Sequence, residues 1–362
     1  MTEQLARIAL QFTPNIGSTT IKKLLQYYGS ASAIFSEKSK ISPLGKRVPL
    51  PKLTTEIRTL AEFELLQMER EQIHLCFYTD DDFPKRLKAC SDSPYLFYYK
   101  GKHIFNEQKM VAVVGTRNIS PYGKDVTNKI ISELAQYDIC VVSGLARGVD
   151  TVAHEQALDC ELKTAAVLGC GLRRIYPDTN ARLAHRIIEH EGAIISEFPF
   201  ATQPDRQNFP QRNRIIAGLS DVTIVMETAS KGGSIITAYI AQSYNRDVMA
   251  VPGNIFSQTY DGCHDLIKKN VAAMATSGAD VAELMGWDLQ PKHAIQRSLF
   301  VELSDEEQTV IQAIEEGNNI AIDDLSLALA QFTPSKLAAI LLQLELKGVI
   351  ECAPGKTYRI CP

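Results

Sequence analysis

The sequence predicts an α/β protein with a Rossmann-like parallel sheet core, an N-terminal helical domain and a C-terminal winged helix. Through the middle of the chain, short apolar runs alternate with helical patterns, as in sheets whose strands are joined by helices. Gly, Ser and Arg residues follow several of these runs, and a pair of helices joined by a short turn is expected at each end of the chain. We expect domains at residues 1–80, 81–290 and 298–362.

The first 80 residues predict a helical domain of the SAM or helix-hairpin-helix type. Residues 5–10 and 20–28 have helical patterns, and Pro14, Asn15 and Gly17 lie in the turn between them. A helix-hairpin-helix grips a phosphate backbone through its hairpin amides. Asn15 stands where the first hairpin glycine is usual, so a plain helical packing unit remains an alternative of at least equal weight.

The middle segment predicts a parallel sheet covered by helices. Its apolar runs lack the polar alternation of a half-exposed strand, which indicates burial on both faces. The expected strands are residues 110–114, 139–142, 164–168, 193–195, 222–226 and 248–251, and the clearest helical patterns are 126–134, 180–189 and 234–244. Ligands of such sheets bind beyond the carboxyl ends of the strands, so the residues that follow each strand are the first site candidates.

The end of the chain predicts a polar linker at 290–298, followed by a winged helix. Ser304 and three acidic residues would begin its first helix. Helices at 323–330 and 335–347 and a β-hairpin wing would complete it. The expected reading helix has only Lys336 and Lys347 as bases, and residues 291–362 have a net charge of −4. We therefore expect this domain to contact protein, or the rest of its own chain, rather than duplex DNA.

Composition excludes several classes of protein. No apolar run approaches the ~20 residues that span a bilayer, and the N-terminus lacks a signal-peptide pattern. The eight cysteines form no Cys-x-x-Cys pair, which predicts reduced thiols in a cytoplasmic protein without a metal site. Residues 1–80 have a net charge of +2 and residues 81–290 of −2. Any DNA must therefore bind a local basic patch.

Two loops after expected strands have the residues of a phosphate site. Gly115, Thr116 and Arg117 follow one strand, and glycine lets a phosphate approach the backbone while Thr and Arg donate hydrogen bonds. The second loop begins at the end of another strand and leads into a helix, whose free amides attract anions. It contains Ser143, Gly144, Arg147 and Gly148.

A third segment combines an aromatic residue with cations. Phe209, Arg212, Asn213 and Arg214 crowd into six residues before the apolar run at 222–226. Such a cluster suits a ligand with both phosphates and flat rings. A further loop offers amides and a cation through Lys231, Gly233 and Ser234.

The common nucleotide cofactors do not fit the chain. It has neither a P-loop nor a Gly-x-Gly-x-x-Gly fingerprint after the first strand of the sheet, so we expect no cofactor. Asp150, Glu197 and Glu227 lie near strand ends and are the acid/base candidates. Helix capping, or holding Arg212 and Arg214 in place, is the structural alternative for these carboxylates. We expect no catalytic residue.

The order of the motifs resembles the DNA-processing protein A family of bacteria, also called DprA or Smf. The motifs are Val113-Val114-Gly115-Thr116-Arg117, Tyr122-Gly123, residues 143–150, Tyr176-Pro177, Ile195-Ser196-Glu197, residues 209–220, residues 234–238 and Val251-Pro252-Gly253. The resemblance covers about residues 110–280 strongly, and the flanking segments fit the three-part layout of the family. The chain departs from the family pattern at 231–234 and 262–271.

The resemblance implies a non-enzymatic homodimer that binds single-stranded DNA in the cytoplasm. Family members load the RecA recombinase onto incoming DNA during natural transformation and protect that DNA. Carried onto this chain, the DNA pocket would use Arg117, the loop 143–148 and the segment 209–214. Two other readings stay open: a nucleotide-processing enzyme of the phosphoribohydrolase type, whose Pro-Gly-Gly-x-Gly-Thr motif is absent, and an assembly scaffold with an idle pocket.

Overall fold

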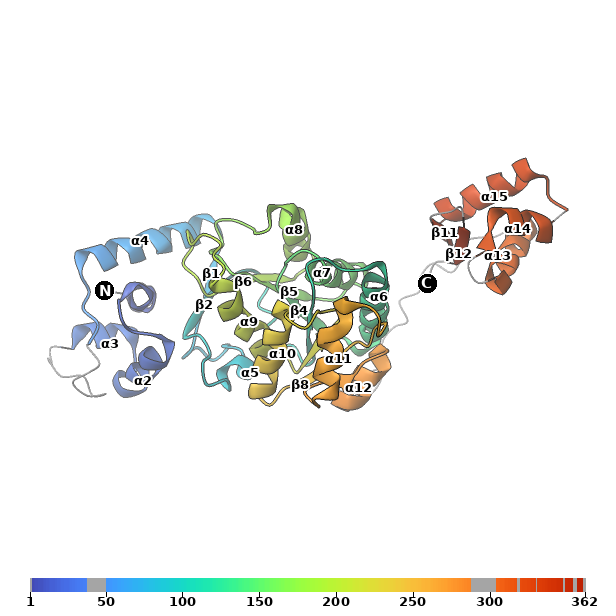
Figure 1. The fold of residues 1–362 in the computed structure, drawn as a ribbon. Coiled ribbons are helices and arrows are strands. Elements are labelled where there is room, and N and C mark those ends of the chain that lie inside the picture. Colours follow the sequence, from blue (N-terminus) through green and yellow to red (C-terminus); the bar gives the residue numbers. More distant parts are fainter. Residues whose placement is uncertain are drawn as a thin grey trace. The chain divides into compact units, whose positions relative to one another are not determined.

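The computed structural model describes residues 2–37, 50–287, 304–317, 320–329, 331–347, 349–353 and 357–360 (Figure 1). The chain divides into two compact units, Met1–Gln290 and Pro291–Pro362. The expected linker at 290–298 lies outside the described residues. No described helix combines the length and the apolar character that crossing a membrane requires.

The described residues of the first unit form a nine-stranded sheet with the order β1-β2-β6-β5-β4-β3-β7-β8-β9. Its strands are β1 (His74–Phe77), β2 (Leu96–Gly101), β3 (Met110–Val114), β4 (Cys140–Ser143), β5 (Thr164–Val167), β6 (Ala193–Ser196), β7 (Val222–Val225), β8 (Asp247–Ala250) and β9 (Ala273–Met274). Every pair from β6 to β9 is parallel, whereas β1 and β2 form an antiparallel edge. The expected parallel core is confirmed, and all five residues of β3 are buried.

Helices cover both faces of this sheet. They are α5 (Lys85–Lys88), α6 (Pro121–Leu134), α7 (Val149–Asp159), α8 (Ala181–Glu189), α9 (Asn208–Leu219), α10 (Gly233–Ser243), α11 (Asp261–Lys268) and α12 (Gly278–Met285). The chain moves outward from β3 to β6, then returns to pair β7 with the other side of β3. Right-handed crossovers therefore place α6, α7 and α8 on one face and α9 and α10 on the other. Figure 1 shows α9 beside α10 and α6 beside α7, which are packed pairs.

The return of the chain creates a switch point between β3 and β7. In open α/β sheets, the crevice outside the carboxyl ends of such strands is where ligands bind. The loops after β3 and β7 begin at Gly115 and Met226, and they are joined by a hydrogen bond of 2.7 Å from the Thr116 amide to the Glu227 carbonyl. The fold thus places the loops singled out in the sequence at the carboxyl end of the parallel strands.

The N-terminal segment is helical, as expected, and packs on the sheet through an apolar core. Its helices are α1 (Glu3–Ala9), the 3-10 turn Leu10–Phe12, α2 (Ser18–Tyr28), α3 (Ala31–Ser36) and α4 (Thr55–Arg70). Ile8, Leu24 and Ile34 share one buried cluster with Ile194 of β6. The strand β1 precedes residue 80 and yet belongs to the sheet. The division into domains at that residue stays a prediction.

Buried polar contacts also fasten the N-terminal helices to the core. Gln11 donates to the Glu197 carbonyl at 2.8 Å and accepts from the Tyr98 hydroxyl at 2.5 Å. Glu64 of α4 is 2% exposed and accepts a 2.6 Å hydrogen bond from the Phe200 amide. Because buried polar groups need partners, these contacts fix how the helices sit on the sheet.

The second unit has the winged-helix elements α13 (Asp305–Gly317), β10 (Ile320–Ala321), α14 (Ile322–Ala328), α15 (Pro334–Leu346), β11 (Ile350–Ala353) and β12 (Thr357–Ile360). Its described strands are ordered β10-β12-β11. Val310, Leu325 and Leu341 lie in a core of its own. Lys336 pairs with Glu306, and Lys347 pairs with Glu307 at 2.7 Å. Both bases of the expected reading helix are thus engaged, and its contact with protein rather than duplex DNA stays a prediction.

Glu64 predicts a pH dependence of stability. Burial raises its pKa from 4.5 to about 6, although the Phe200 amide opposes the shift. A raised carboxyl pKa means that the folded chain binds more protons, so the free energy of unfolding falls as pH rises from about 4.5 through about 6. Glu64→Gln removes this titration while it retains an acceptor for Phe200. We expect the variant to gain about 2 kcal/mol at neutral pH, and less at lower pH.

Urea unfolding of both proteins across this pH window measures the difference. Glu62→Gln is the matched control, because Glu62 lies on the same helix with a side chain 52% exposed. The prediction fails if Glu64→Gln and the native chain differ by the same amount at every pH.

Candidate nucleic-acid interface

A cleft lies outside the carboxyl ends of β3, β4, β5 and β7. It comprises two cavities of about 580 and about 370 Å³. Both cavities are lined by Arg117, Ala146, Phe209 and Arg212, so they are two parts of one cleft on either side of these residues. The larger part extends to residues 176–179, and the smaller part to residues 228–237 at the start of α10.

Phe209 and Arg117 line both cavities and lie between them, and we call this pair the divider of the cleft. The Arg117 guanidinium carbon lies 5.2 Å from the centre of the Phe209 ring. The Tyr176 ring lies 5.8 Å from the same ring, inclined by 34°, and Tyr176 is 39% exposed. Gly169 packs directly against the Phe209 ring, and a Cβ at this position would lie only 2.8 Å from a ring carbon. An aromatic surface therefore stands beside a cation in the cleft.

The loop after β4 is held rigidly by side chains beneath it. The Asp150 carboxylate accepts from the amides of Gly144 at 3.1 Å and Ala146 at 3.2 Å. Ser143 is buried and donates to the Val113 carbonyl at 2.6 Å. Gly148 begins α7 with φ at +79°, a conformation that favours glycine. This framework leaves the Arg147 side chain exposed at the edge of the larger cavity.

Arg212 is 5% exposed and joins α9 to two strands. Its guanidinium donates to the Gly144 carbonyl at 2.6 Å and also to the Val167 carbonyl. Burial lowers its pKa to about 10 against the favourable charge of Asp150, and burial raises the pKa of Asp150 against the charge of Arg212. Arg212 lines the cleft, but its hydrogen bonds are directed to the protein.

Arg214 lines neither cavity, and its side chain is bound by the protein. It forms an ion pair with Glu197 and donates to the Asp92 carbonyl. Burial raises the pKa of Glu197, while the charge of Arg214 acts against this shift. The ion pair of Glu197 with Arg214 agrees with the structural alternative for that carboxylate, whereas Asp150 accepts from loop amides and acts on Arg212 only through its charge. Glu227 instead accepts from the amide and hydroxyl of Ser120, at 3.0 and 2.9 Å, at the start of α6.

The start of α10 lines the smaller cavity. Gly233 and Ser234 form its first turn, so amides at this helix N-terminus face the cleft. The Ser234 hydroxyl is buried and has no hydrogen-bond partner among the described residues. Lys231 is exposed but lines neither cavity. A buried hydroxyl without a partner beside free amides indicates a place for a polar ligand atom.

Most of the residues expected from the sequence meet in this cleft. Ten line one or both cavities: Gly115, Thr116, Arg117, Gly144, Arg147, Phe209, Arg212, Asn213, Gly233 and Ser234. Ser143, Gly148, Arg214 and Lys231 do not, and their binding roles stay predictions. The expected set lacked Asn118, Tyr176 and Thr179, which also line the larger cavity. Tyr176 lies well along the loop that follows β5 and not directly after the strand, although Tyr176-Pro177 was among the motifs.

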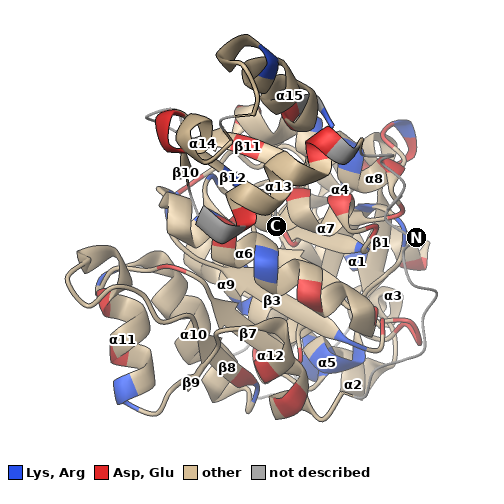
Figure 2. Ribbon diagram, turned by 90° about the vertical axis from the view of Figure 1, so that its right-hand side faces the viewer, with Lys and Arg blue, Asp and Glu red and all other residues tan. Residues whose placement is uncertain are grey.

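The arginines that line the cleft differ in whether the protein already binds their side chains. Within the described ranges, Arg117 and Arg147 form neither an ion pair nor a hydrogen bond, and both are exposed. Elsewhere charges are mixed: in the view of Figure 2, basic and acidic residues are interspersed, as on α11. The positive potential that the sequence required locally is therefore available from these two arginines.

Comparison with known proteins places the chain in a family. Residues 74–286 match the family described as DNA recombination-mediator protein A, and residues 299–356 match the DprA winged helix domain. The chain is 34% identical over 308 residues to protein Smf of Escherichia coli, which covers 84% of this chain and 82% of that protein. It is 43% identical over 202 residues to the DNA processing protein DprA of Streptococcus pneumoniae, which covers 56% of this chain and 71% of that protein.

Solved structures agree with this placement. The structure of DprA from Streptococcus pneumoniae superposes with a TM-score of 0.62 at 31% identity, covering 80% of this chain and 99% of that chain. DprA from Helicobacter pylori, described by its single-stranded DNA binding mode, superposes with a TM-score of 0.54 at 30% identity and covers 60% of this chain and 98% of that chain. The fold, the winged helix and these matches show that the chain belongs to the DNA recombination-mediator protein A family, known as DprA or Smf.

Proposed function

We propose that the chain binds single-stranded DNA in this cleft and acts as a recombination mediator. In this proposal it works in the cytoplasm as a homodimer, protects incoming DNA during natural transformation and loads the RecA recombinase onto it. Family membership and the Helicobacter pylori relative's single-stranded DNA binding support the DNA ligand. The observation that carries the proposal is the pairing of a free arginine with an aromatic ring inside the cleft.

The Phe209 ring suits an unpaired base and not a duplex. Stacking on an aromatic ring contributes about 1–3 kcal/mol per base and is nearly independent of which base it is. A duplex hides its base faces, so a half-buried ring inside a cleft gains little from it. The Arg117 guanidinium, which has no hydrogen bond in the described part of the chain, would leave the ring for a phosphate when a base takes its place.

Phosphates have partners on both sides of the divider. Arg147 lies in the larger cavity, and the first turn of α10 with the Ser234 hydroxyl lies in the smaller one. Because the loop after β4 is already fixed by Asp150, binding orders few additional residues. A backbone of successive phosphates can therefore cross the cleft with its bases directed at Phe209 and Tyr176.

The carboxylates of the cleft do not favour an enzyme. Among the described residues that line it, Asp150 is committed to two amides and Asp178 to Arg174, at 2.9 Å. His154 is fully buried behind the loop, and burial lowers its pKa to about 3. We propose that the chain is not an enzyme. Release of free base from nucleoside monophosphates would instead support the phosphoribohydrolase reading.

Titration of the purified chain with single- and double-stranded oligonucleotides tests the ligand. We expect preference for single strands and weak dependence on sequence. Assembly of RecA filaments on coated single strands, with and without the chain, tests loading separately. Equal affinity for both forms of DNA would overturn the proposed ligand.

The first variant that tests the cleft is Arg117→Ala. Removing one phosphate contact should weaken single-strand binding and reduce the slope of log affinity against log salt by roughly 0.7. Arg58→Ala is the matched control, because Arg58 is an exposed arginine on α4 that lines neither cavity. Binding isotherms at several salt concentrations measure the slope. An unchanged slope in Arg117→Ala would remove this arginine from the phosphate path.

The second variant, Phe209→Ala, tests stacking. We expect a loss of about 1–3 kcal/mol in binding free energy with a nearly unchanged salt slope, because no charge is removed. Phe209→Tyr should restore most of the affinity. Phe63→Ala, at a 47% exposed phenylalanine on α4, is the control. Equal affinity of Phe209→Ala and the native chain would exclude this ring from the site.

A further inference from the structure

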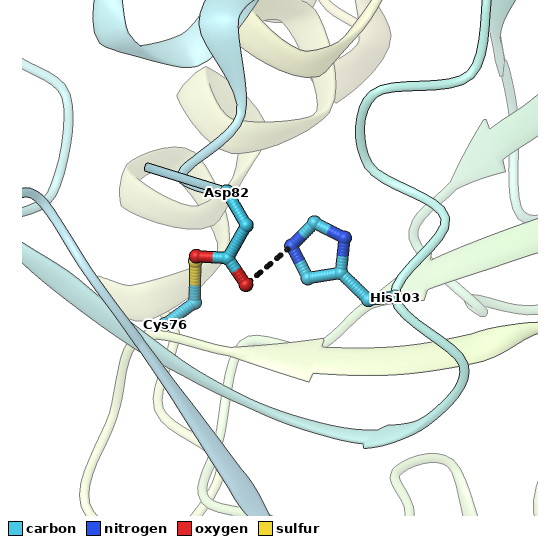
Figure 3. A group of neighbouring side chains, drawn as sticks. All are labelled: Cys76, Asp82 and His103. Atoms are coloured by element: carbon cyan, nitrogen blue, oxygen red, sulfur yellow. Dashed lines mark ion pairs between the residues drawn. The ribbon is translucent and has the colours of Figure 1, made fainter. Parts of the chain in front are cut away.

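Three side chains outside the cleft come together at the edge of the sheet. Cys76 lies on β1, Asp82 on the loop that follows β1, and His103 on the segment that follows β2 (Figure 3). One potential ligand atom of each, namely the thiol sulfur, a carboxylate oxygen and an imidazole nitrogen, lies within 4.8 Å of the other two. None of the three lines the DNA cleft.

The geometry is close to that of a zinc site. Zinc takes Cys, His and Asp ligands at about 2.0–2.3 Å in a tetrahedron, which holds neighbouring ligand atoms roughly 3.3–3.8 Å apart. Nε2 of His103 lies 3.7 Å from Oδ2 of Asp82, and Figure 3 shows the imidazole and the carboxylate facing each other. Small side-chain rotations would therefore bring all three atoms onto one ion.

The imidazole nitrogen supplies a second, independent observation. Nε2 of His103 is buried and has no hydrogen-bond partner in the described part of the chain. Its contact with Asp82 at 3.7 Å is too long for a hydrogen bond, and a metal bond would satisfy the nitrogen. The rings of Tyr99 and Phe105, at 5.7 and 4.7 Å, pack on the imidazole and limit its rotation.

The loop with Asp82 is fixed in place, as a metal site requires. Asn106, just beyond His103, donates from its side-chain amide to the Asp82 carbonyl at 3.0 Å and accepts from the Lys85 amide at 2.9 Å. Asp80 turns the same loop by accepting from the Phe77 amide at 3.1 Å. These contacts tie the Asp82 loop to the strand before it and to the His103 segment.

The thiol does not fit a catalytic nucleophile. Cys76 is 2% exposed, and burial, together with Asp82 and Asp80, raises the pKa of its thiol far above the usual range. A nucleophilic cysteine needs the opposite shift. A divalent cation displaces the thiol proton and can hold the thiolate beside a carboxylate, because it replaces repulsion with two attractions. Thiolate and imidazole ligands favour zinc over magnesium or calcium.

We propose that Cys76, Asp82 and His103 bind one zinc ion, with a water molecule in the fourth position. The ion would join β1, the loop that follows it and the segment that follows β2. It would thereby strengthen the antiparallel pair β1–β2 at the side of the sheet.

Cobalt titration of the reduced, chelator-treated full chain tests this site. We expect one equivalent of Co²⁺ to give the near-ultraviolet thiolate-to-cobalt band and the visible bands of tetrahedral cobalt. Added Zn²⁺ should abolish both. Zn²⁺ alone should raise the melting temperature of the chain.

The variants are chosen so that folding does not decide the result. Asp82→Asn lies on an exposed loop, and Asp81→Asn makes the same charge change at the neighbouring exposed residue. We expect Asp82→Asn and His103→Gln to lower Co²⁺ affinity by about tenfold or more, and Asp81→Asn to leave it unchanged. Cys76→Ser should lose the thiolate band, whereas Cys263→Ser, at another buried cysteine, should retain it.

The proposal is overturned if the native chain shows no thiolate band. It is also overturned if Asp82→Asn and Asp81→Asn bind Co²⁺ equally well, because the ion would then sit elsewhere.

Discussion

The buried guanidinium of Arg212 is the interaction on which the cleft depends. It binds carbonyls after β4 and at the end of β5, and it faces the carboxylate that holds the loop after β4. Taking a guanidinium out of water costs several kcal/mol unless its donors are satisfied, so α9 is held against the loop after β4 and the end of β5. Phe209 lies one helical turn before Arg212 on α9. The Arg212 guanidinium, which organises the carboxyl ends of β4 and β5, therefore also positions the Phe209 ring.

This arrangement separates two uses of arginine that look alike in a sequence. Arg212 and Arg214 flank Asn213 and are engaged with the protein, whereas Arg117 and Arg147 lie on separate loops and are exposed. The difference follows from which elements surround each side chain. A residue-type pattern records that cations are concentrated near strand ends, and only the fold shows which of them have internal carboxylate or carbonyl partners.

The sequence predicted the parallel core well because strands buried on both faces have a strong apolar signal. It did not indicate β1, β2 and β9. The first two form an antiparallel edge with residues such as His74 and Lys100, and β9 has two residues. The sequence indicated the side chains of the stretch after Phe209 as site candidates but did not predict the helix α9. Pro210 and Gly218 obscure its helical period. Tyr176 was missed as a site residue because it reaches the cleft through a long loop after β5. The Cys76 cluster was also missed, because its members meet only through the β1–β2 pairing.

The proposed function requires a slightly acidic core to bind a polyanion, and a cleft makes this possible where an open surface would not. Two exposed arginines and the amides of α10 act at short range, where the acidic groups nearby already have partners: Asp150 accepts from two loop amides, and Asp178 pairs with Arg174. A cleft of this kind favours a flexible strand that can enter with its bases turned toward Phe209. In the proposed function a rigid duplex would meet the outer, mixed-charge surface first, so the charge distribution that permits binding would also select the single strand.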